Sequence, residues 1–204
     1  MEHLDRAYKC GDRIIHVYLD EDGGGCDPRD RTCVSVMWFF HRGRHSGLGD
    51  PKHVTADDFE GWEDMQRALR EDYDALFITP VSMYEHGGRS LSLGVTHGWD
   101  SGQLGYMWTT KERLAETVGA DATEAVVREA YEAELKEYNC WIEGDCWGFQ
   151  RVEDGQERNE GGCWGFLGND DKESGLLHEA FGADWEKAVE VRAVAHVSTV
   201  WSHE

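Results

Sequence analysis

The sequence predicts an α+β fold in a single domain, with a mostly antiparallel sheet and two or three packed acidic helices. Short β-rich segments separated by turn signals predict the strands, and apolar residues spaced three and four apart predict the helices. The chain has 204 residues, three prolines and no Ser/Pro-rich or Gly/Ser-rich linker. We therefore expect one domain over residues 1–204.

The expected strands are apolar, β-branched segments bounded by glycine, proline or polar turn residues. They cover 13–19, 33–41, 75–84, 89–97, 103–110 and a last segment that begins near residue 188. If the three strands between 75 and 110 pair in chain order, the strand 89–97 lies between the other two. The turns 85–88 and 98–102 would then lie about 23 to 30 Å apart, at opposite ends of that strand.

Two long helices are expected, with short helices after Thr109 and from Ser174 to Phe181. Thr55 and Asp58 form a capping box that predicts the start of the first long helix, which extends to residue 74. The second is expected over residues 122–138. Their apolar stripes are Phe59, Trp62, Met65, Leu69 and Tyr73 in the first helix and Val127, Tyr131, Leu135 and Tyr138 in the second.

Acidic residues dominate the surface charge. The chain has 41 Asp and Glu against 20 Lys and Arg, a net charge of −21. The acids are concentrated in three ranges, residues 50–74, 111–145 and 153–190. The first two ranges contain the long predicted helices. A protein that displays carboxylates along its helices can occupy the basic channel of a nucleic-acid-binding protein. An acidic surface also serves solubility alone, which leaves open an acidic accessory protein without mimicry.

The charge pattern yields a set of candidate partner-binding residues. Their expected partner is a host nucleic-acid-binding protein with a basic surface, and we expect no direct binding to DNA, RNA or a membrane. The candidates are Asp57, Glu60, Asp64, Glu71, Asp74, Glu124, Glu129, Glu132, Glu137, Asp170 and Asp171.

The segment from Ala75 to Thr110 contrasts with the rest of the chain, because Glu85, Arg89 and Asp100 are its only Asp, Glu, Lys or Arg residues. Its two turns carry His86, Asp100 and Ser101. An alternative hypothesis is therefore that the protein is a small phage enzyme with a pocket around these three side chains. The pattern G-x-S-x-G is absent, and so are phosphate-binding glycine motifs. We expect Trp99, Tyr106 and Trp108 to belong to the core, with no catalytic residue in the leading interpretation.

The six cysteines do not show the spacings of zinc sites or of a disulfide framework. We expect buried free thiols, no metal and no cofactor. Cys146-Trp147-Gly148-Phe149 recurs as Cys163-Trp164-Gly165-Phe166, with the turn signal Asp154-Gly155 between the copies. The echo predicts a hairpin in which each copy places Trp and Phe on one strand face.

Four ordered blocks resemble a family of small proteins found in phages and mobile elements. They are PVSMYEHGGRSLSLG (80–94), WDSGQLGYMWTTKE (99–112), YNCWIEGDCWGF (138–149) and GGCWGFLGND (161–170). The resemblance covers about half of the chain, from Pro80 to Asp170. It implies a phage-type origin and a shared fold, and no reaction. This chain has His97-Gly98 where a Cys-Pro pair often precedes the tryptophan in the family, which argues against a catalytic thiol there.

These observations favour a non-enzymatic, phage-encoded interaction protein that inhibits a host defence complex, in the manner of antirestriction or anti-CRISPR proteins. We expect it in the host cytoplasm, because no apolar run reaches the length of a membrane span and no secretion signal is visible.

Overall fold

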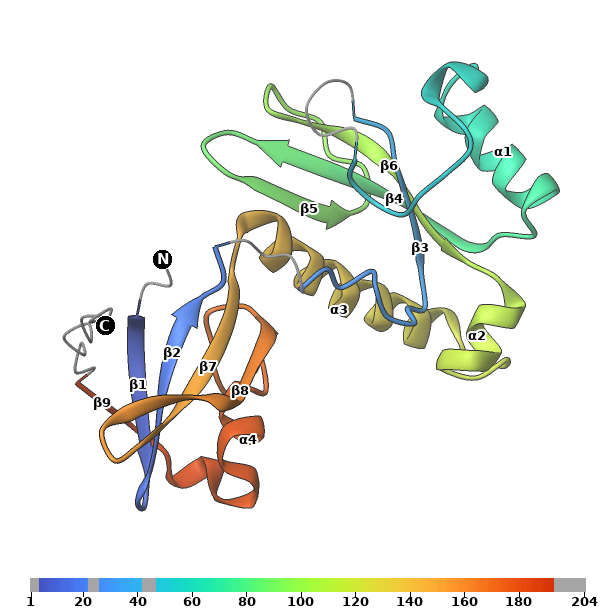
Figure 1. Cartoon of the computed structure of the whole chain (residues 1–204). Helices are drawn as coiled ribbons and strands as arrows, with labels where there is room; N and C mark the ends of the chain where they lie inside the picture. The colour runs from blue at the N-terminus through green and yellow to red at the C-terminus, as the bar shows by residue number, and fades with distance from the viewer. Residues whose placement is uncertain (1–3, 22–25, 42–46, 193–204) are drawn as a thin grey trace, which may run out of the picture. The chain divides into compact units, whose positions relative to one another are not determined.

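The computed structural model describes residues 4–21, 26–41 and 47–192. Within these ranges the chain forms four α-helices, two short 3₁₀ turns and nine strands in two antiparallel sheets (Figure 1). The predicted α+β class with mostly antiparallel sheets is confirmed. The chain divides into two compact units, the terminal unit (Met1–Asp27 with Gly144–Glu204) and the central unit (Pro28–Glu143). A single domain over residues 1–204 stays a prediction.

The terminal unit contains a five-stranded sheet in the order β8-β7-β2-β1-β9. Its strands are β1 (Leu4–Cys10), β2 (Arg13–Leu19), β7 (Cys146–Glu153), β8 (Gln156–Leu167) and β9 (Val189–Val191). The short helix α4 (Leu176–Phe181) ends at Gly182, as the sequence predicts, and buries its apolar side chains against Ile15, Val17 and Phe149 of the sheet. The predicted last strand is present as β9, and the rest of it lies outside the described residues.

The two Cys-Trp-Gly-Phe copies form the predicted hairpin, with Asp154 and Gly155 as its turn. Both turn residues have positive φ, 52° and 75°, as a type I′ hairpin turn requires. The register shifts at Gly165, so Gly148 pairs with Trp164 and Trp147 pairs with Phe166. This β-bulge places Trp164 over Gly148 on the face away from the core, while Phe166 packs into the core. The expectation that Trp and Phe share one face in both copies is therefore wrong for the second copy.

Cys26 and Cys146 form a disulfide, with Cα atoms 6.5 Å apart. The expectation that the cysteines are buried free thiols is therefore wrong for this pair and holds for Cys10 and Cys33. Cys140 and Cys163 are free but only half-buried. The pair was missed because 120 positions separate the two residues in the sequence. Burial raises the pKa of the Cys33 thiol, which makes that thiol unreactive near neutral pH.

The central unit contains a four-stranded sheet in the order β3-β6-β4-β5. Its elements are β3 (Val36–Phe39), α1 (Trp62–Asp72), β4 (Leu76–Glu85), β5 (Arg89–Leu93), β6 (Ser101–Thr109), α2 (Lys111–Thr117) and α3 (Glu124–Glu143). Strand β4 lies between β5 and β6, because it pairs antiparallel with both of them. The chain-order arrangement expected from the sequence is therefore wrong.

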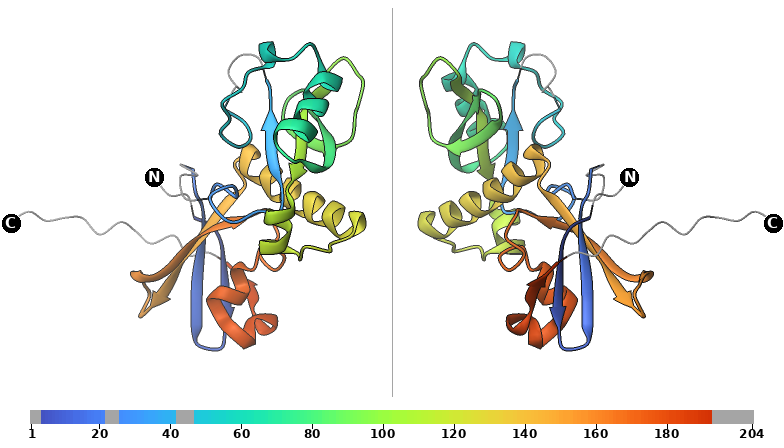
Figure 2. Two further views of the ribbon diagram at one scale, coloured as in Figure 1. Left: turned by 90° about the vertical axis from the view of Figure 1, so that its right-hand side faces the viewer. Right: turned by 90° about the vertical axis from the view of Figure 1, so that its left-hand side faces the viewer.

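The two long helices of the central unit cover opposite faces of this sheet (Figures 1 and 2). The predicted stripe of α3, Val127, Tyr131, Leu135 and Tyr138, is buried against Met37, Val81 and Met107. On the other face, Met65 and Leu69 of α1 pack against Trp38, Tyr106 and Trp108. Neighbouring residues of a strand point to opposite faces, so the Tyr106-Met107-Trp108 run supplies both cores. The exposed sides of α1 and α3 consequently face in different directions.

The first long helix begins later than the capping box predicts. Thr55 and Asp58 do form the box, but it closes only a 3₁₀ turn over Ala56–Asp58. The helix α1 begins at Trp62 after Gly61, whose φ of 154° is far from helical values. The backbone of residues 59–61 is therefore not helical.

The helix α3 holds the edge strand β5 in place. The side chain of Asn139 accepts a hydrogen bond from Leu91 N at 2.7 Å and donates one to Leu91 O at 2.9 Å. The carboxylate of Glu143 accepts a hydrogen bond from Arg89 N at 2.6 Å. An edge strand otherwise presents these backbone groups to solvent. The turn between β4 and β5 is thereby tied to the end of α3.

Candidate functional site

The structure brings His86 and Asp100 together. Glu85, the last residue of β4, donates its backbone N–H to Asp100 O at 2.9 Å, and Tyr84 pairs with Ser101 at the start of β6. The turn after β4 therefore lies beside the residues that precede β6. His86 Nδ1 and Asp100 Oδ2 are 3.4 Å apart, so the separation of about 23 to 30 Å expected from chain-order pairing is wrong.

A cavity of about 340 Å³ adjoins this pair in the central unit. Its lining includes Phe40, His41, Glu85, Trp99, Asp100 and Ser101. His41 Nε2 lies 3.7 Å from Glu85 Oε2, which adds a second histidine and carboxylate to the site. His41 and Phe40 were missed from the sequence because they follow β3, which enters the site only through its pairing with β6.

The geometry of the three candidate catalytic side chains does not form a nucleophile–base pair. Within the described residues, no hydrogen bond joins Ser101 Oγ to a histidine, and its near neighbour is Gly98, where an added Cβ would lie 2.7 Å from that oxygen. The side chains of His86 and Asp100 are 71% and 45% exposed, so solvent screens their attraction. Asp100 and Ser101 line the cavity, so a polar ligand there can form hydrogen bonds with them.

Trp99 is fully exposed, with a relative accessibility of 103%, although the sequence predicts it in the core. Tyr106 and Trp108 are buried as expected. Trp99 lies in the loop before β6, where no helix or strand covers it, whereas the other two lie within β6 between two layers of side chains. The indole of Trp99 is therefore presented to solvent at the cavity.

The candidate partner-binding residues differ in how freely they present their charge. Asp57, Glu60, Glu71, Asp74, Glu124 and Glu129 are exposed, and among the described residues they have no Lys or Arg partner. Three others share their charge with an arginine, in the pairs Asp64–Arg67, Glu132–Arg128 and Glu137–Arg31. Asp170 accepts hydrogen bonds from the backbone N–H groups of Lys172 and Glu173.

Asp171 is not available to a partner, because it is 4% exposed and anchors Arg6. Both carboxylate oxygens accept hydrogen bonds from the guanidinium, at 2.6 Å each, and the guanidinium lies 4.0 Å from the centre of the Trp147 ring. Burial opposes the charge of Arg6, but the bonds and charges of Asp171 and Asp5 outweigh it and raise the pKa of Arg6. Asp171 is a structural residue of the terminal unit.

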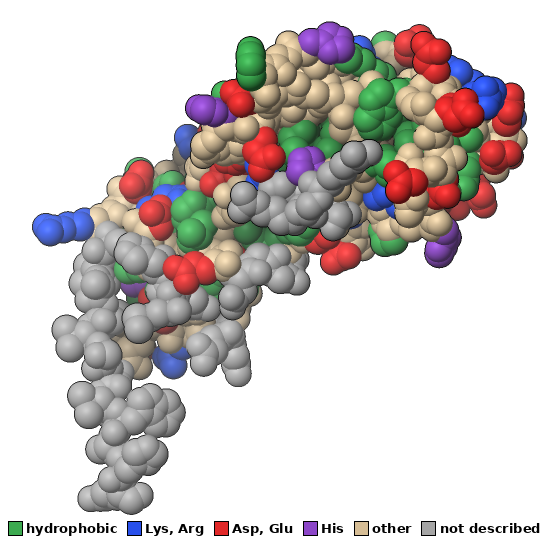
Figure 3. Space-filling model, turned by 90° about the horizontal axis from the view of Figure 1, so that it is seen from above, with side chains coloured by type: hydrophobic (Ala, Val, Ile, Leu, Met, Phe, Trp, Pro, Cys, Tyr) green, Lys and Arg blue, Asp and Glu red, His purple; other side chains and the backbone are tan. Residues whose placement is uncertain are grey.

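The segment 57–74 consists of α1 and the turn before it. In the central unit it has the highest density of exposed Asp and Glu side chains without an ion-pair partner among the described residues. The structure adds Glu63 and Asp72 to the candidates, both exposed and without an ion-pair partner among the described residues. Both lie inside the helix predicted from the sequence, so the charge count of that helix was the signal that could have identified them. Figure 3 shows acidic side chains, with Lys or Arg side chains among them, in the right-hand part of the view.

No family model, curated protein or solved structure matches this chain. None of the helices in the described ranges is long and apolar enough to cross a membrane.

Proposed function

We propose that this chain is a non-enzymatic, phage-encoded interaction protein. It inhibits a host defence complex, in the antirestriction or anti-CRISPR manner, by occupying the basic surface with which that complex binds nucleic acid. The observation that carries the proposal is a set of carboxylates in segment 57–74 that are exposed and have no Lys or Arg partner among the described residues. They belong to Asp57, Glu60, Glu63, Glu71 and Asp72. The host compartment of such a complex is the cytoplasm.

The number of carboxylates along α1 is similar to the number of phosphates along an equal length of one DNA strand. In α1, Glu63, Asp64, Glu71 and Asp72 span nine residue steps, or about 14 Å along the helix axis. One strand of duplex DNA carries a negative charge every ~3.4 Å, which is about four charges over the same length. Arg67 and Arg70 offset part of the negative charge of α1. The acidic residues of the preceding turn add negative charge that compensates for these two arginines.

The helix α1 is a better docking surface than α3. Segment 57–74 has eight acidic and two basic residues, whereas α3 has six acidic and two basic residues, Arg128 and Lys136. Glu134 points inward and accepts hydrogen bonds from the backbone of Val34 and Ser35. Because the two helices cover opposite faces of the sheet, one flat basic surface contacts one of them at a time.

A tagged pull-down from host lysate, washed at low and then high salt, tests the proposal. We expect a nucleic-acid-binding protein that is released by salt and by added duplex DNA, because both compete for its basic groups. Recovery of a partner that withstands high salt and ignores DNA would contradict mimicry and indicate an acidic accessory protein.

The contact between His86 and Asp100 favours a second candidate, a small enzyme or ligand-binding protein that uses the cavity around Asp100 and Ser101. The blocks of residues 80–94 and 99–112, which carry the family resemblance, meet at this cavity. Loss of inhibition in a folded Asp100→Ala variant, with full inhibition after charge reversal at Glu63 and Glu71, would establish this candidate over the first.

A further inference from the structure

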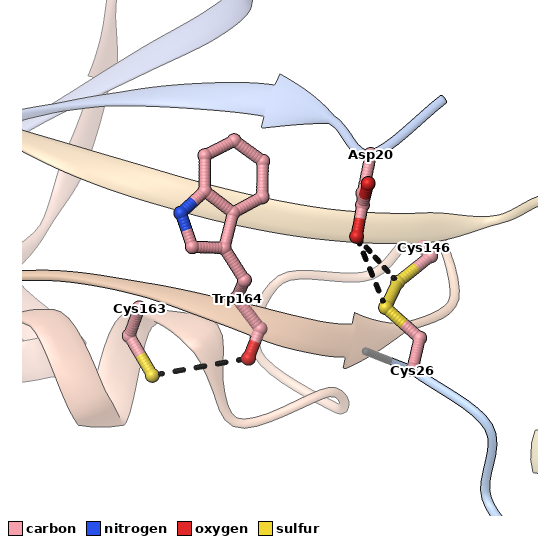
Figure 4. Close-up of a disulfide and its surroundings, with 5 residues drawn as sticks. All are labelled: Asp20, Cys26, Cys146, Cys163 and Trp164. Carbon is pink, nitrogen blue, oxygen red and sulfur yellow. Dashed lines mark hydrogen bonds between the residues drawn. A yellow bond between two sulfur atoms is a disulfide. The ribbon is translucent and has the colours of Figure 1, made fainter. Parts of the chain in front are cut away.

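We infer that the reduced form of the terminal unit binds a zinc ion through Asp20, Cys26 and Cys146. This inference is independent of the proposed function. The two sulfur atoms and a carboxylate oxygen of Asp20 lie within 4.8 Å of one another (Figure 4). Asp20 follows β2, and Cys146 begins β7, which pairs with β2.

The three ligand atoms already have nearly the separation that zinc requires. Asp20 Oδ2 lies 3.5 Å from the sulfur of Cys26 and 3.9 Å from that of Cys146. Tetrahedral zinc, with bonds of about 2.3 Å to sulfur and about 2.0 to 2.2 Å to oxygen, places these atoms about 3.6 Å apart. The sulfur atoms themselves must separate to about 3.8 Å, which becomes possible when their bond is reduced.

The surroundings of the three side chains are those of a built site. Cys26 and Cys146 are 4% and 1% exposed, so a metal bound between them is shielded from solvent. The backbone N–H of Asp20 donates to Cys146 O at 2.8 Å, which fixes the start of the Asp20 side chain beside β7. In the oxidised form, the disulfide has no proton to donate to the Asp20 carboxylate. In the reduced form, a cation bound between the two thiolates attracts that carboxylate directly.

The two states interconvert by balanced chemistry. A phosphine reductant and one water convert the disulfide into two thiols and a phosphine oxide. Zinc then binds both sulfurs and the Asp20 carboxylate and releases the two thiol protons. Three protein ligands leave a fourth position for water, as in zinc sites with an open coordination position. In a reducing compartment such thiols stay reduced, so the metal-binding form is the one expected there.

Cobalt(II) titration of the intact chain tests the inference, because cobalt bound to thiolates absorbs visible light and gives a thiolate-to-metal charge-transfer band. The chain is reduced, freed of phosphine and titrated without oxygen. We expect one equivalent to bind, the bands to disappear when zinc is added, and at least a tenfold weaker affinity in Asp20→Asn. The oxidised chain is the matched control, since it has the same sequence and no free thiolate at this site.

The second Cys-Trp-Gly-Phe copy supplies a further control. Cys163 lies in β8 at the position that corresponds to Cys146, and its sulfur is directed toward Trp164 O and is not part of the disulfide (Figure 4). Cys163→Ser should keep the cobalt bands, and Cys26→Ser should abolish them. Absence of the bands in the reduced wild-type chain, or bands of equal intensity in the folded Cys26→Ser variant, would overturn the inference. If Cys26→Ser does not fold, the comparison of reduced, oxidised and Asp20→Asn chains decides it.

Discussion

His86 Nδ1 lies 3.4 Å from Asp100 Oδ2, and this contact joins the turn after β4 to the residues that precede β6. The backbone bond from Glu85 N to Asp100 O fixes the same junction. Asp100 lines the cavity, and the backbone bond holds this junction without either side chain. Because a backbone hydrogen bond holds the junction, the two side chains can be replaced without loss of the fold.

Replacing Asp100 by alanine should change the free energy of unfolding by less than about 1 kcal/mol, because its side-chain contact with His86 is exposed to solvent. Urea unfolding of wild type and Asp100→Ala measures this change. A loss of several kcal/mol would mean that the side chain supports the junction, and the variant would then be unusable as a test of the cavity.

Replacing Asp171 by alanine should lower the free energy of unfolding by about 3 to 5 kcal/mol, because it leaves the guanidinium of Arg6 buried without its carboxylate. Denaturant unfolding measures the loss. Glu179→Gln, on the exposed side of α4, is the control and should change stability by less than about 0.5 kcal/mol. An Asp171→Ala variant as stable as the control would contradict the structural role assigned to this carboxylate.

Replacing Gly148 by alanine should cost about 1 to 3 kcal/mol, because the added Cβ would lie 2.1 Å from the ring of Trp164. The cost should shrink in a Trp164→Ala background, where the ring is absent. A double-mutant cycle of unfolding free energies measures the coupling between the two positions. Equal costs in both backgrounds would show that the tryptophan does not pack over this glycine.

The stability of the terminal unit should fall as the pH rises from about 10 to 12. Burial and the hydrogen bond to Asp171 raise the pKa of Tyr8 to about 12, above the unfolded value of about 10. The unfolded chain therefore loses this proton first, so unfolding becomes more favourable across that window. Unfolding curves at several pH values, compared with Tyr8→Phe, measure the effect. The same decline in both chains would exclude Tyr8 as its source.

The local elements could be predicted from the sequence because their periodicity is strong. The stripe of Val127, Tyr131, Leu135 and Tyr138 gives α3 its buried face, although the helix continues beyond its predicted end. The turn signal Asp154-Gly155 predicts the hairpin of β7 and β8. Pattern and turn chemistry are properties of neighbouring residues, which is why both predictions are confirmed.

The relations between distant elements could not be predicted in the same way. Strand order depends on which strand buries its second edge, and no local pattern shows that β4 lies between β5 and β6. The bulge at Gly165 and the pairing of Cys26 with Cys146 arise from the same long-range packing. The site at His86 and Asp100 was consequently identified by its residues but not by its geometry.

The most direct test of the proposed mimicry is the salt dependence of binding to the captured partner. The variant Glu63→Lys/Glu71→Lys alters α1, and Glu124→Lys/Glu129→Lys makes the same charge change on α3, on the opposite face of the sheet. For wild type we expect the logarithm of the association constant to fall linearly with the logarithm of salt concentration. The α1 variant should bind more weakly and with a shallower slope, and the α3 variant should resemble wild type. Equal weakening by both variants, or binding that does not respond to salt, would contradict docking through α1.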